Sequence, residues 1–438
     1  MRSAAPCARP PNRDAAHEAA AVSLQFEILH QSPSTQARVG RITTPHGVFD
    51  TPAFMPVGTR AAIKGLLPSL VAETGSQTIL ANTYHLMLRP GADLVERRGG
   101  LHTFMNWPGP ILTDSGGYQV YSMADLNKMT DEGVRFRSVI DGAMIDLTPE
   151  RSIEVQHQLG ADIIMAFDDC PPSVDPVNFN ETRKRLSAQR QSSFAKNYDH
   201  DKRLEVANER TIRWLERCDE THRTSGRADR QALFGIVQGG ADLARRSWSA
   251  ERVCSVELPG YAIGGVAVGE GFRDILRVVD HTAPLLPREK PRYLMGVGYE
   301  RDLVAASRAG CDMFDCVLPT RNGRNANAFT PTGPIRLKNA RFAEDDGPID
   351  ESCDCPACRG FSRAYLRHLF LAEEMLGPIL CSLHNVRHFQ RLMLDIRDTI
   401  REDNWSAFIR RWPVASEGCL GPDDPGARDA DVGHARPA

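Results

Sequence analysis

Eight short apolar segments recur along the chain, each followed by a polar or glycine-rich stretch and then by residues with helical periodicity. The segments are PAFMPVG (52–58), TILAN (78–82), ILTDSGG (111–117), DIIMAFDD (162–169), LFGIVQGG (233–240), YAIGGVAVG (261–269), YLMGVG (293–298) and CDMFDCVLP (311–319). Strands that are apolar throughout and separated by helices indicate a parallel sheet covered on both faces. Eight such units predict an α/β fold of the (β/α)₈ TIM-barrel type rather than an open sheet.

Polar residues and glycines gather where these segments end. They are Asp114, Asp168, Asp169, Gln238, Gly264, Gly265, Gly298 and Asp315. In a barrel the carboxyl ends of the strands converge on one face, and active sites of this architecture lie there. The sequence therefore predicts an active site built from these residues.

The last apolar segment runs directly into a basic loop. It contains Asp312 and Asp315, and residues 316–343 that follow include five basic side chains and no acidic one. The basic side chains are Arg321, Arg324, Arg336, Lys338 and Arg341. A carboxylate beside a cationic loop favours chemistry on a polyanion, with phosphate held by the loop. A strand end with an incidentally basic loop is the alternative for this segment taken alone.

Composition narrows the class of protein. The hydrophobic fraction of 41% and the charged fraction of 25% are ordinary for a globular chain. A formal net charge of −3 excludes a uniformly basic nucleic-acid binder, so any nucleic-acid contact must be local. No apolar run approaches the roughly 18–20 residues that a membrane span needs. The first twenty residues have no apolar signal core, and we expect a cytoplasmic protein without membrane contact.

The expected domain organisation has four parts. Residues 1–22 are predicted to form a disordered extension, and 23–345 a barrel domain with N-terminal strands and an inserted helical region near 181–230. Residues 346–412 are predicted to form a helical zinc-binding subdomain. The Gly-, Pro- and Asp-rich residues 413–438 are predicted to be a disordered tail.

Three cysteines within six residues define a candidate metal site. Cys353, Cys355 and Cys358 have a spacing that suits tetrahedral zinc, which needs one further ligand. His384 and His388 lie one helical turn apart and are both candidates, with His368 a third. Four protein ligands would leave no open position, so a single zinc ion here is expected to be structural.

Several motifs together resemble the bacterial tRNA-guanine transglycosylase (queuine tRNA-ribosyltransferase) family. They are TDSGGYQ (113–119), FDDC (167–170), GIVQGG (235–240), GGVAVGE (264–270), MFDCVLPTRNGRNA (313–326) and the Cys-x-Cys-x2-Cys cluster with a later His. The resemblance extends from about residue 25 to residue 412. It implies a (β/α)₈ barrel with a zinc subdomain. It also implies exchange of the wobble guanine of tRNAs for Asp, Asn, His and Tyr for a 7-deazaguanine base, on the route to queuosine.

The resemblance also implies roles for individual residues. Asp315 would be the nucleophile and Asp114 the general acid/base. The base would be bound by Ser115, Gly116, Gly117, Tyr118, Asp168, Gln238, Gly264, Gly265 and Met295, with Tyr118 and Met295 sandwiching its ring. The tRNA would contact Gly296, Val297, Gly298, Tyr299, Glu300, Arg301, Asp302, Thr320, Arg321, Asn322, Gly323 and Arg324. The zinc ligands would be Cys353, Cys355, Cys358 and His384. Asp312 and Asp169 are expected to have supporting roles.

Two small residues bear on the choice of base. Cys170 and Val268 match the bacterial pattern, whereas eukaryotic relatives that take the bulkier queuine have a glycine at the Val268 position. A valine there predicts exclusion of queuine and preference for 7-aminomethyl-7-deazaguanine.

Three other functions remain possible at this stage. An archaeosine-type transglycosylase would be expected to carry a further RNA-binding domain, and none is visible after the cysteine cluster. A non-catalytic tRNA-binding subunit of the same fold would be expected to lose Asp114 or Asp315, and both are present. A carbohydrate-active barrel would not explain the cysteine cluster. The resemblance further implies a homodimer formed partly by the zinc region.

Overall fold

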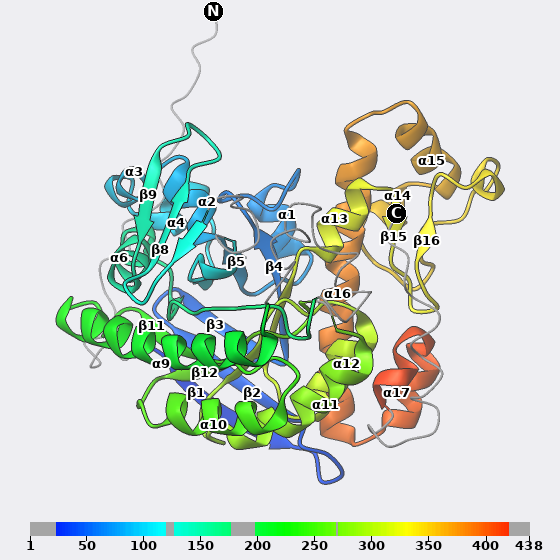
Figure 1. Ribbon diagram of the computed structural model, residues 1–438. Helices are drawn as coiled ribbons and strands as arrows, with labels where there is room; N and C mark the ends of the chain where they lie inside the picture. Colours follow the sequence, from blue (N-terminus) through cyan, green and yellow to red (C-terminus); the bar gives the residue numbers. More distant parts are fainter. Residues whose placement is uncertain (1–22, 120–126, 177–197, 269, 420–438) are drawn as a thin grey trace, which may run out of the picture.

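The computed structural model describes residues 23–119, 127–176, 198–268 and 270–419 (Figure 1). Eight parallel strands form a closed barrel in the order β10-β11-β12-β13-β14-β4-β5-β6. They are β4 Ala53–Gly58, β5 Ile79–Ala81, β6 Ile111–Thr113, β10 Ile163–Met165, β11 Ala232–Val237, β12 Gly260–Ile263, β13 Arg292–Leu294 and β14 Met313–Cys316. Each of the eight predicted apolar segments coincides with one strand to within two residues at its start, and the TIM-barrel prediction is confirmed.

Helices cover the outside of the barrel (Figure 1). They are α1 Pro68–Glu73, α2 Thr83–Leu88, α3 Ala92–Arg97, α4 Gly100–Met105, α6 Pro149–Leu159, α9 His200–Thr224, α10 Leu243–Cys254, α11 Phe272–Thr282 with η1 Ala283–Leu285, α12 Glu300–Arg308 and α13 Leu318–Arg324. The described part of the region predicted as an insertion is α9, which packs between α6 and α10 as the barrel helix that connects β10 to β11. The rest of that region, 177–197, lies outside the described residues.

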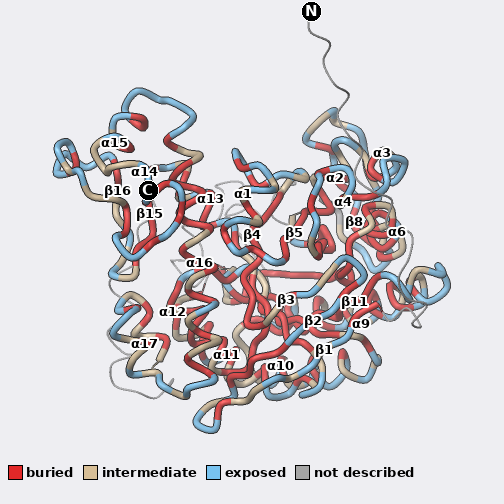
Figure 2. The backbone as a smooth tube through the Cα atoms, turned by 180° about the vertical axis from the view of Figure 1, so that it is seen from behind, coloured by how far each residue is buried: buried red, intermediate tan, exposed pale blue. Residues whose placement is uncertain are grey.

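A three-stranded antiparallel sheet closes the amino-terminal end of the barrel. It consists of β1 Gln25–Gln31, β2 Arg38–Thr44 and β3 Gly47–Thr51. Ile42 and Phe49 from this sheet belong to the same buried cluster as the barrel-interior residues Met55 and Phe234. The chain is buried throughout residues 51–58, where the end of β3 leads into β4 (Figure 2). Because this end is sealed, only the carboxyl ends of the strands remain available for a site.

Asp162, at the start of β10, joins the closing sheet to the barrel. Its carboxylate contacts His46 Nδ1 at 2.8 Å and His102 Nε2 at 3.0 Å, and accepts the N–H of Ile111 at 2.9 Å. The two imidazole rings stack with centroids 3.5 Å apart. Parallel rings at this spacing cannot both direct an in-plane lone pair at one ion, so this cluster serves as a polar connection and not as a metal site.

A second small sheet follows β6 and was not anticipated. Its strands are β7 Asn127–Met129, β8 Val134–Arg137 and β9 Met144–Leu147. Val134 and Phe136 alternate with exposed arginines on β8, so one face packs on the barrel and the other faces solvent.

The C-terminal subdomain is built on one long helix. Its elements are β15 Asn327–Ala328, β16 Ile335–Arg336, η2 Ala340–Phe342, α14 Pro356–Gly360, α15 Arg363–Leu371, α16 Leu376–Glu402, α17 Trp405–Arg411 and η3 Pro413–Cys419. Helix α16 contacts β4, α1, α12 and α13, and therefore completes the ring of helices beside the short α13 that follows β14. Residues 413–419 were predicted to begin a disordered tail, but they form η3 and pack on α12. The extension 1–22 and residues 420–438 lie outside the described residues. None of the helices in the described part of the chain combines the length and apolarity that crossing a membrane requires.

Candidate active site

Asp315 projects from the last barrel strand and is held by one of its two oxygens. Oδ1 accepts the Tyr293 hydroxyl at 2.6 Å and the N–H of Gly296 at 2.8 Å. Among the described residues no hydrogen bond to Oδ2 is found, which leaves that oxygen available to react. Burial raises the pKa of Asp315, and the hydrogen bonds from Tyr293 and Gly296 oppose the rise. This carboxylate is oriented by its neighbours but is not ion-paired.

Asp114 lies at the same end of the barrel, directly after β6. Its carboxylate accepts the Asn82 side-chain amide, the N–H of Thr83 at 2.9 Å and the Gln119 side-chain amide at 2.8 Å. Burial raises the pKa of Asp114 to about 6; the bonds from Asn82 and Thr83 lower it in part, and the charge of Asp315 raises it further. A carboxyl group that titrates near neutral pH can both give and accept a proton.

Asp168 is the third carboxylate of this face, and it is buried. It accepts Ser115 Oγ at 3.1 Å and Gln238 Nε2 at 2.6 Å. Burial raises the pKa of Asp168 to about 6, and the charge of Asp169 adds to the rise. Gly117 lies so close that a Cβ there would come within 2.7 Å of the Asp168 carbonyl oxygen. Ser115, Gly117, Asp168 and Gln238, which were predicted to bind the base, are thus brought together.

The loop after β12 packs on the Gln238 side chain. A Cβ on Gly264 would lie 2.8 Å from Gln238 Nε2, and one on Gly265 would lie 2.3 Å from Gln238 Oε1. Gly265 also has a φ of 61°, which favours glycine. Farther along, the Glu270 carboxylate accepts the N–H groups of Ala267 at 2.6 Å and Val268 at 2.9 Å. The start of this loop is therefore held by packing on Gln238, and Ala267 and Val268 are held by hydrogen bonds to Glu270.

The remaining predicted base contacts lie at the rim. The Tyr118 ring is 45% exposed, as a side chain that stacks on an incoming ring would be. Met295 follows β13 and packs partly against the barrel interior. Gly116, with a φ of 80°, makes the turn between Ser115 and Gly117.

The predicted RNA contacts divide into exposed and buried groups. Gly296, Tyr299 and Arg321 are exposed, and Asn322 and Arg324 are partly exposed. The others are mostly covered: Val297, Gly298, Glu300, Asp302, Thr320 and Gly323 are buried, and Arg301 pairs with Glu417 at 2.7 Å. The side chains able to meet a phosphate backbone therefore come mainly from the loop after β13 and from α13.

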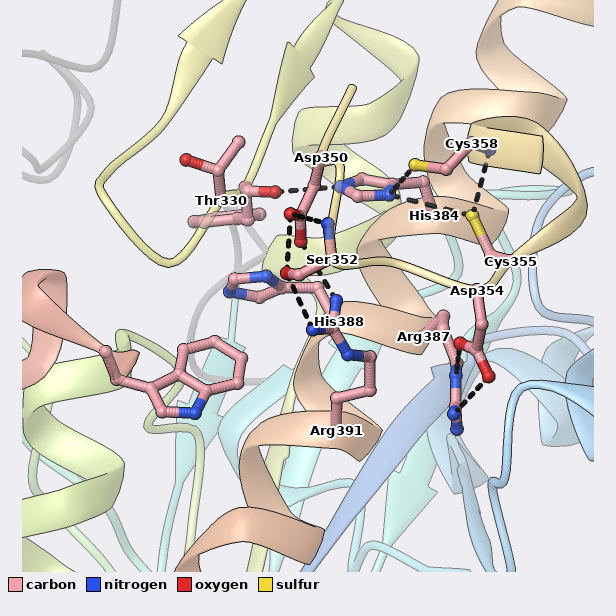
Figure 3. A network of polar contacts seen from close by, with 12 residues as sticks. Thr330, Asp350, Ser352, Asp354, Cys355, Cys358, His384, Arg387, His388 and Arg391 are labelled. Atoms are coloured by element: carbon pink, nitrogen blue, oxygen red, sulfur yellow. Dashed lines mark hydrogen bonds and ion pairs between the residues drawn. The ribbon is translucent and has the colours of Figure 1, made fainter. Parts of the chain in front are cut away.

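Cys353, Cys355, Cys358 and His384 form a buried cluster that could hold a metal ion. Their ligand atoms all lie within 4.8 Å of one another. His384 Nε2 is 2.8 Å from the carbonyl oxygen of Phe329, so it carries the proton, and Nδ1 faces Cys358 Sγ at 3.2 Å. A hydrogen bond from the other ring nitrogen to a carbonyl, as Nε2 makes to Phe329, is the contact that usually orients a metal-binding histidine. In Figure 3 His384 points from α16 toward the labelled cysteines.

Helix α16 also supports the cysteine loop with two arginines. Arg387 makes a two-pronged contact with Asp354 at 2.7 and 2.8 Å, and Arg391 pairs with Asp350 at 2.9 Å (Figure 3). His388, the competing zinc-ligand candidate, instead contacts Glu300 Oε1 at 2.9 Å and joins α16 to α12.

Two aspartates with predicted supporting roles have structural contacts. Asp312 pairs with buried Arg38 at 2.6 Å and accepts the N–H of Arg292 at 2.7 Å, at the closed end of the barrel. Asp169 is buried beneath α9 and pairs with Arg203 at 2.5 Å and with Arg210 at 2.6 Å. Asp169 therefore anchors α9 next to Asp168.

Sequence reasoning missed several residues that hold these groups in place. Asn82 and Tyr293 donate to Asp114 and Asp315, and Glu270 holds the loop after β12. Asn82 is the last residue of an apolar segment, which was the available signal, whereas Tyr293 lies within β13 and resembles any other buried strand residue. Arg246, on α10, gave no signal, because one arginine beside another on a helix is typical of a solvated face.

Fold and site together are those of a (β/α)₈-barrel enzyme with several carboxylates gathered at the carboxyl ends of its strands. The family described as "Queuine tRNA-ribosyltransferase" matches residues 32–417. A queuine tRNA-ribosyltransferase of Symbiobacterium thermophilum is 50% identical over 395 residues, which cover 89% of this chain and 92% of the relative. Relatives with the same name from Thermus thermophilus (50% over 387 residues, 88% and 93%) and Synechococcus elongatus (48% over 394 residues, 90% and 96%) are similar to the same extent.

The chain belongs to the queuine tRNA-ribosyltransferase family, the tRNA-guanine transglycosylases, and is a pentosyltransferase.

Proposed function

We propose that this enzyme exchanges the wobble guanine of tRNAs for Asp, Asn, His and Tyr for 7-aminomethyl-7-deazaguanine, through a covalent aspartyl-ribose intermediate. The observation that carries this proposal is a pair of carboxylates at the same end of the barrel. Asp315 is held by one of its oxygens, and its charge helps to raise the pKa of Asp114 to about 6. Displacement of a base from ribose passes through an oxocarbenium-like state that a carboxylate can trap.

The two half-reactions balance without a cofactor. Asp315 Oδ2 bonds to the anomeric carbon as the bond to the glycosidic nitrogen breaks, and Asp114 gives the departing guanine a proton. The incoming base then loses its glycosidic N–H proton to Asp114, bonds to the anomeric carbon and releases Asp315. Two inversions give net retention, and ping-pong kinetics follow.

Hydrogen-bond complementarity supports guanine as the base. Ionised Asp168 can accept the ring N–H and the exocyclic amine, while the Gln238 amide and the N–H of Gly265 can donate to the carbonyl oxygen. Gln238 Nε2 donates a hydrogen bond to the Asp168 carboxylate, so these two base-binding groups are hydrogen-bonded to each other when no base is bound. Adenine would leave these groups unpaired, which can cost a discrimination of about 10⁴.

Incorporation of radiolabelled guanine tests the function directly. The substrate is a tRNA with guanine at the wobble position, and the control is the same tRNA with adenine there. Label is expected only in the first, and 7-aminomethyl-7-deazaguanine should release it again. Label at another guanine would favour an archaeosine-type activity, and tRNA binding without label would favour a non-catalytic subunit.

Guanine binding is expected to weaken as pH falls through about 6. Asp168 must be ionised to accept two N–H groups, and its pKa is about 6 in the free protein. Between pH 7 and pH 5 the ionised fraction falls roughly tenfold, so the dissociation constant for guanine should rise roughly tenfold. Isothermal titration calorimetry between pH 7 and pH 5 measures this change in the dissociation constant. A flat profile would contradict the role of Asp168, and Asp168→Asn should bind weakly with little dependence on pH.

Val268→Gly is expected to admit queuine. Val268 is half-buried in the loop that Glu270 holds after β12, and removal of its side chain would make room for a larger substituent on the base. We expect measurable queuine incorporation, with at most about tenfold loss of activity toward the smaller base. Exchange assays with both bases check this, with Val266→Ala in the same loop as the control. No gain of queuine activity would count against Val268 as the selector.

Three further features complete the proposal. Arg321, Asn322 and Arg324 at the end of α13 would contact the anticodon backbone. The cysteine–histidine cluster would hold one structural zinc ion, because four closed ligands of this kind suit zinc and leave no position for water. We also infer a cytoplasmic homodimer, for which exposed Tyr365, Leu371 and Met375 on the zinc subdomain offer an apolar surface.

A further inference from the structure

Arg246 is a buried cation that the reaction scheme does not yet use. It lies in the first turn of α10, and its exposed fraction is 0%. Its guanidinium donates to four backbone carbonyls: Nε to Gly240 at 2.8 Å, Nη1 to Val237 at 3.1 Å and to Gly264 at 2.6 Å, and Nη2 to Gly265 at 2.9 Å.

The need to satisfy four backbone carbonyls accounts for a donor at this position, but it does not account for a positive charge. In the part of the chain that the structure describes, no carboxylate lies within ion-pair distance of Arg246. Burial lowers its pKa to about 10, with Glu270 opposing the shift, so the group stays charged at neutral pH. A buried charge without a direct counter-ion costs free energy, and apolar residues of similar volume often serve as well or better.

The four carbonyls belong to the two loops assigned to base recognition. Val237 and Gly240 flank Gln238 in the loop after β11, and Gly264 and Gly265 form the loop after β12. The carbonyl of Gly264 and the N–H of Gly265 belong to one planar peptide group, so a bond that fixes the carbonyl also fixes the direction of the N–H. The guanidinium therefore sets the positions of Gln238 and of the N–H of Gly265 relative to each other.

The charge adds a second effect. A donor bound to the carbonyl side of a peptide polarises its N–H and makes that N–H a stronger donor. Departure of the base moves negative charge onto the purine, including its carbonyl oxygen. A preorganised donor aimed at developing charge contributes more in the transition state than in the ground state.

We propose that Arg246 is a positioning residue that orients and polarises the Gly264–Gly265 peptide toward the carbonyl oxygen of guanine, and so supports departure of the purine. This inference rests on the proposed function, because it takes guanine as the base. Arg246 does not touch the substrate itself. Its effect should appear selectively on ligands with a strong acceptor at the carbonyl position.

The test compares guanine with 6-thioguanine, which keeps both N–H donors but replaces the carbonyl oxygen by a weakly accepting sulfur. Arg246→Met removes the charge and the donors at similar volume. Dissociation constants from calorimetry should show the preference for guanine reduced by about tenfold, and kcat for guanine exchange should fall by about a hundredfold. Arg245→Met is the matched control, because this neighbouring arginine pairs with Asp201 and Asp242 at the surface; it should stay within about twofold of the parent.

Equal weakening of both ligands by Arg246→Met would indicate a merely structural role and overturn the inference. Parent protein that binds guanine no tighter than 6-thioguanine would also overturn it. If Arg246→Met does not fold, Arg246→Lys serves as the second variant. An ammonium group cannot bind the carbonyls of Gly264 and Gly265 together as the guanidinium does, so the preference for guanine over 6-thioguanine should again fall. An unchanged preference in Arg246→Lys would overturn the inference. The binding measurements do not need tRNA, so failure of exchange in the parent protein counts against the proposed function and not against this inference.

Discussion

Asp315→Asn is expected to abolish base exchange while the protein stays folded. The amide keeps the shape of the carboxylate but cannot form the ester with ribose, and loss of a nucleophile typically costs on the order of 10⁴-fold or more in kcat. The covalent tRNA–protein adduct, seen as a shifted band on a denaturing gel, should disappear. Binding of tRNA should change little, because Asp315 is one group within a wide RNA surface.

The melting temperature of Asp315→Asn gives a second, independent test. Burial raises the pKa of Asp315, so ionisation at neutral pH opposes folding, and this penalty grows as pH rises through the raised pKa. The neutral amide avoids it, so Asp315→Asn should melt at or above the parent temperature at pH 7.5. The difference should disappear as pH falls toward the ordinary pKa of an aspartate.

Asp312→Asn, three residues earlier on the chain, is the matched control. Asp312 pairs with buried Arg38 at the opposite end of the barrel, and loss of one partner of such a pair costs about 3–5 kcal/mol. This variant should lose stability but keep its kcat per folded molecule. An Asp315→Asn protein that still exchanged guanine, or an Asp312→Asn protein that folded normally and lost exchange, would contradict the assignment of the nucleophile.

The barrel could be predicted from sequence because its strands are buried on both faces. Such strands appear as continuous apolar segments, and eight of them with intervening helices leave few alternatives. The predicted segments extend beyond the strands: β5 covers only Ile79–Ala81 and β10 only Ile163–Met165. The excess includes the polar residues Asn82, Asp168 and Asp169, which follow the strands at the carboxyl end of the barrel. The sheet β7–β9 was missed because its strands are three or four residues long, and because β8 and β9 are partly exposed, a pattern shared with ordinary loops.

The proposed site was predictable only where a single residue type at one strand end is proposed to carry the chemistry. Asp114, Asp168, Gln238 and Asp315 satisfy this condition. The supporting contacts do not, because Arg246 acquires its role from two loops that meet only in the folded chain. His384 and His388 share one face of α16, and spacing alone could not separate them. The fold does so, because His384 faces the cysteines and His388 faces Glu300.

Cys358→Ser is expected to release the metal and unfold the subdomain around it. The three cysteines belong to a small core with Ala357, Leu366 and Leu369. A hydrophobic core of this size is too small to be stable alone, and a structural zinc ion can contribute on the order of 10 kcal/mol to the free energy of folding. Metal analysis should fall from one zinc per chain to nearly none. Limited proteolysis should then cut between 345 and 375, where the parent protein resists.

Loss of the metal should also disturb the proposed tRNA-binding residues of α13. Gly323 of α13 packs directly on Ser382 of α16, where a Cβ would come within 2.7 Å of the Ser382 backbone nitrogen. Helix α16 carries His384, so displacement of the helix should move Arg321 and Arg324 and raise the KM for tRNA more than it lowers kcat. Cys254→Ser, a half-buried cysteine on α10 outside the cluster, should change none of these properties. A Cys358→Ser protein that kept one zinc ion, or lost it and remained protease-resistant with unchanged KM, would show that the cluster does not hold the subdomain together.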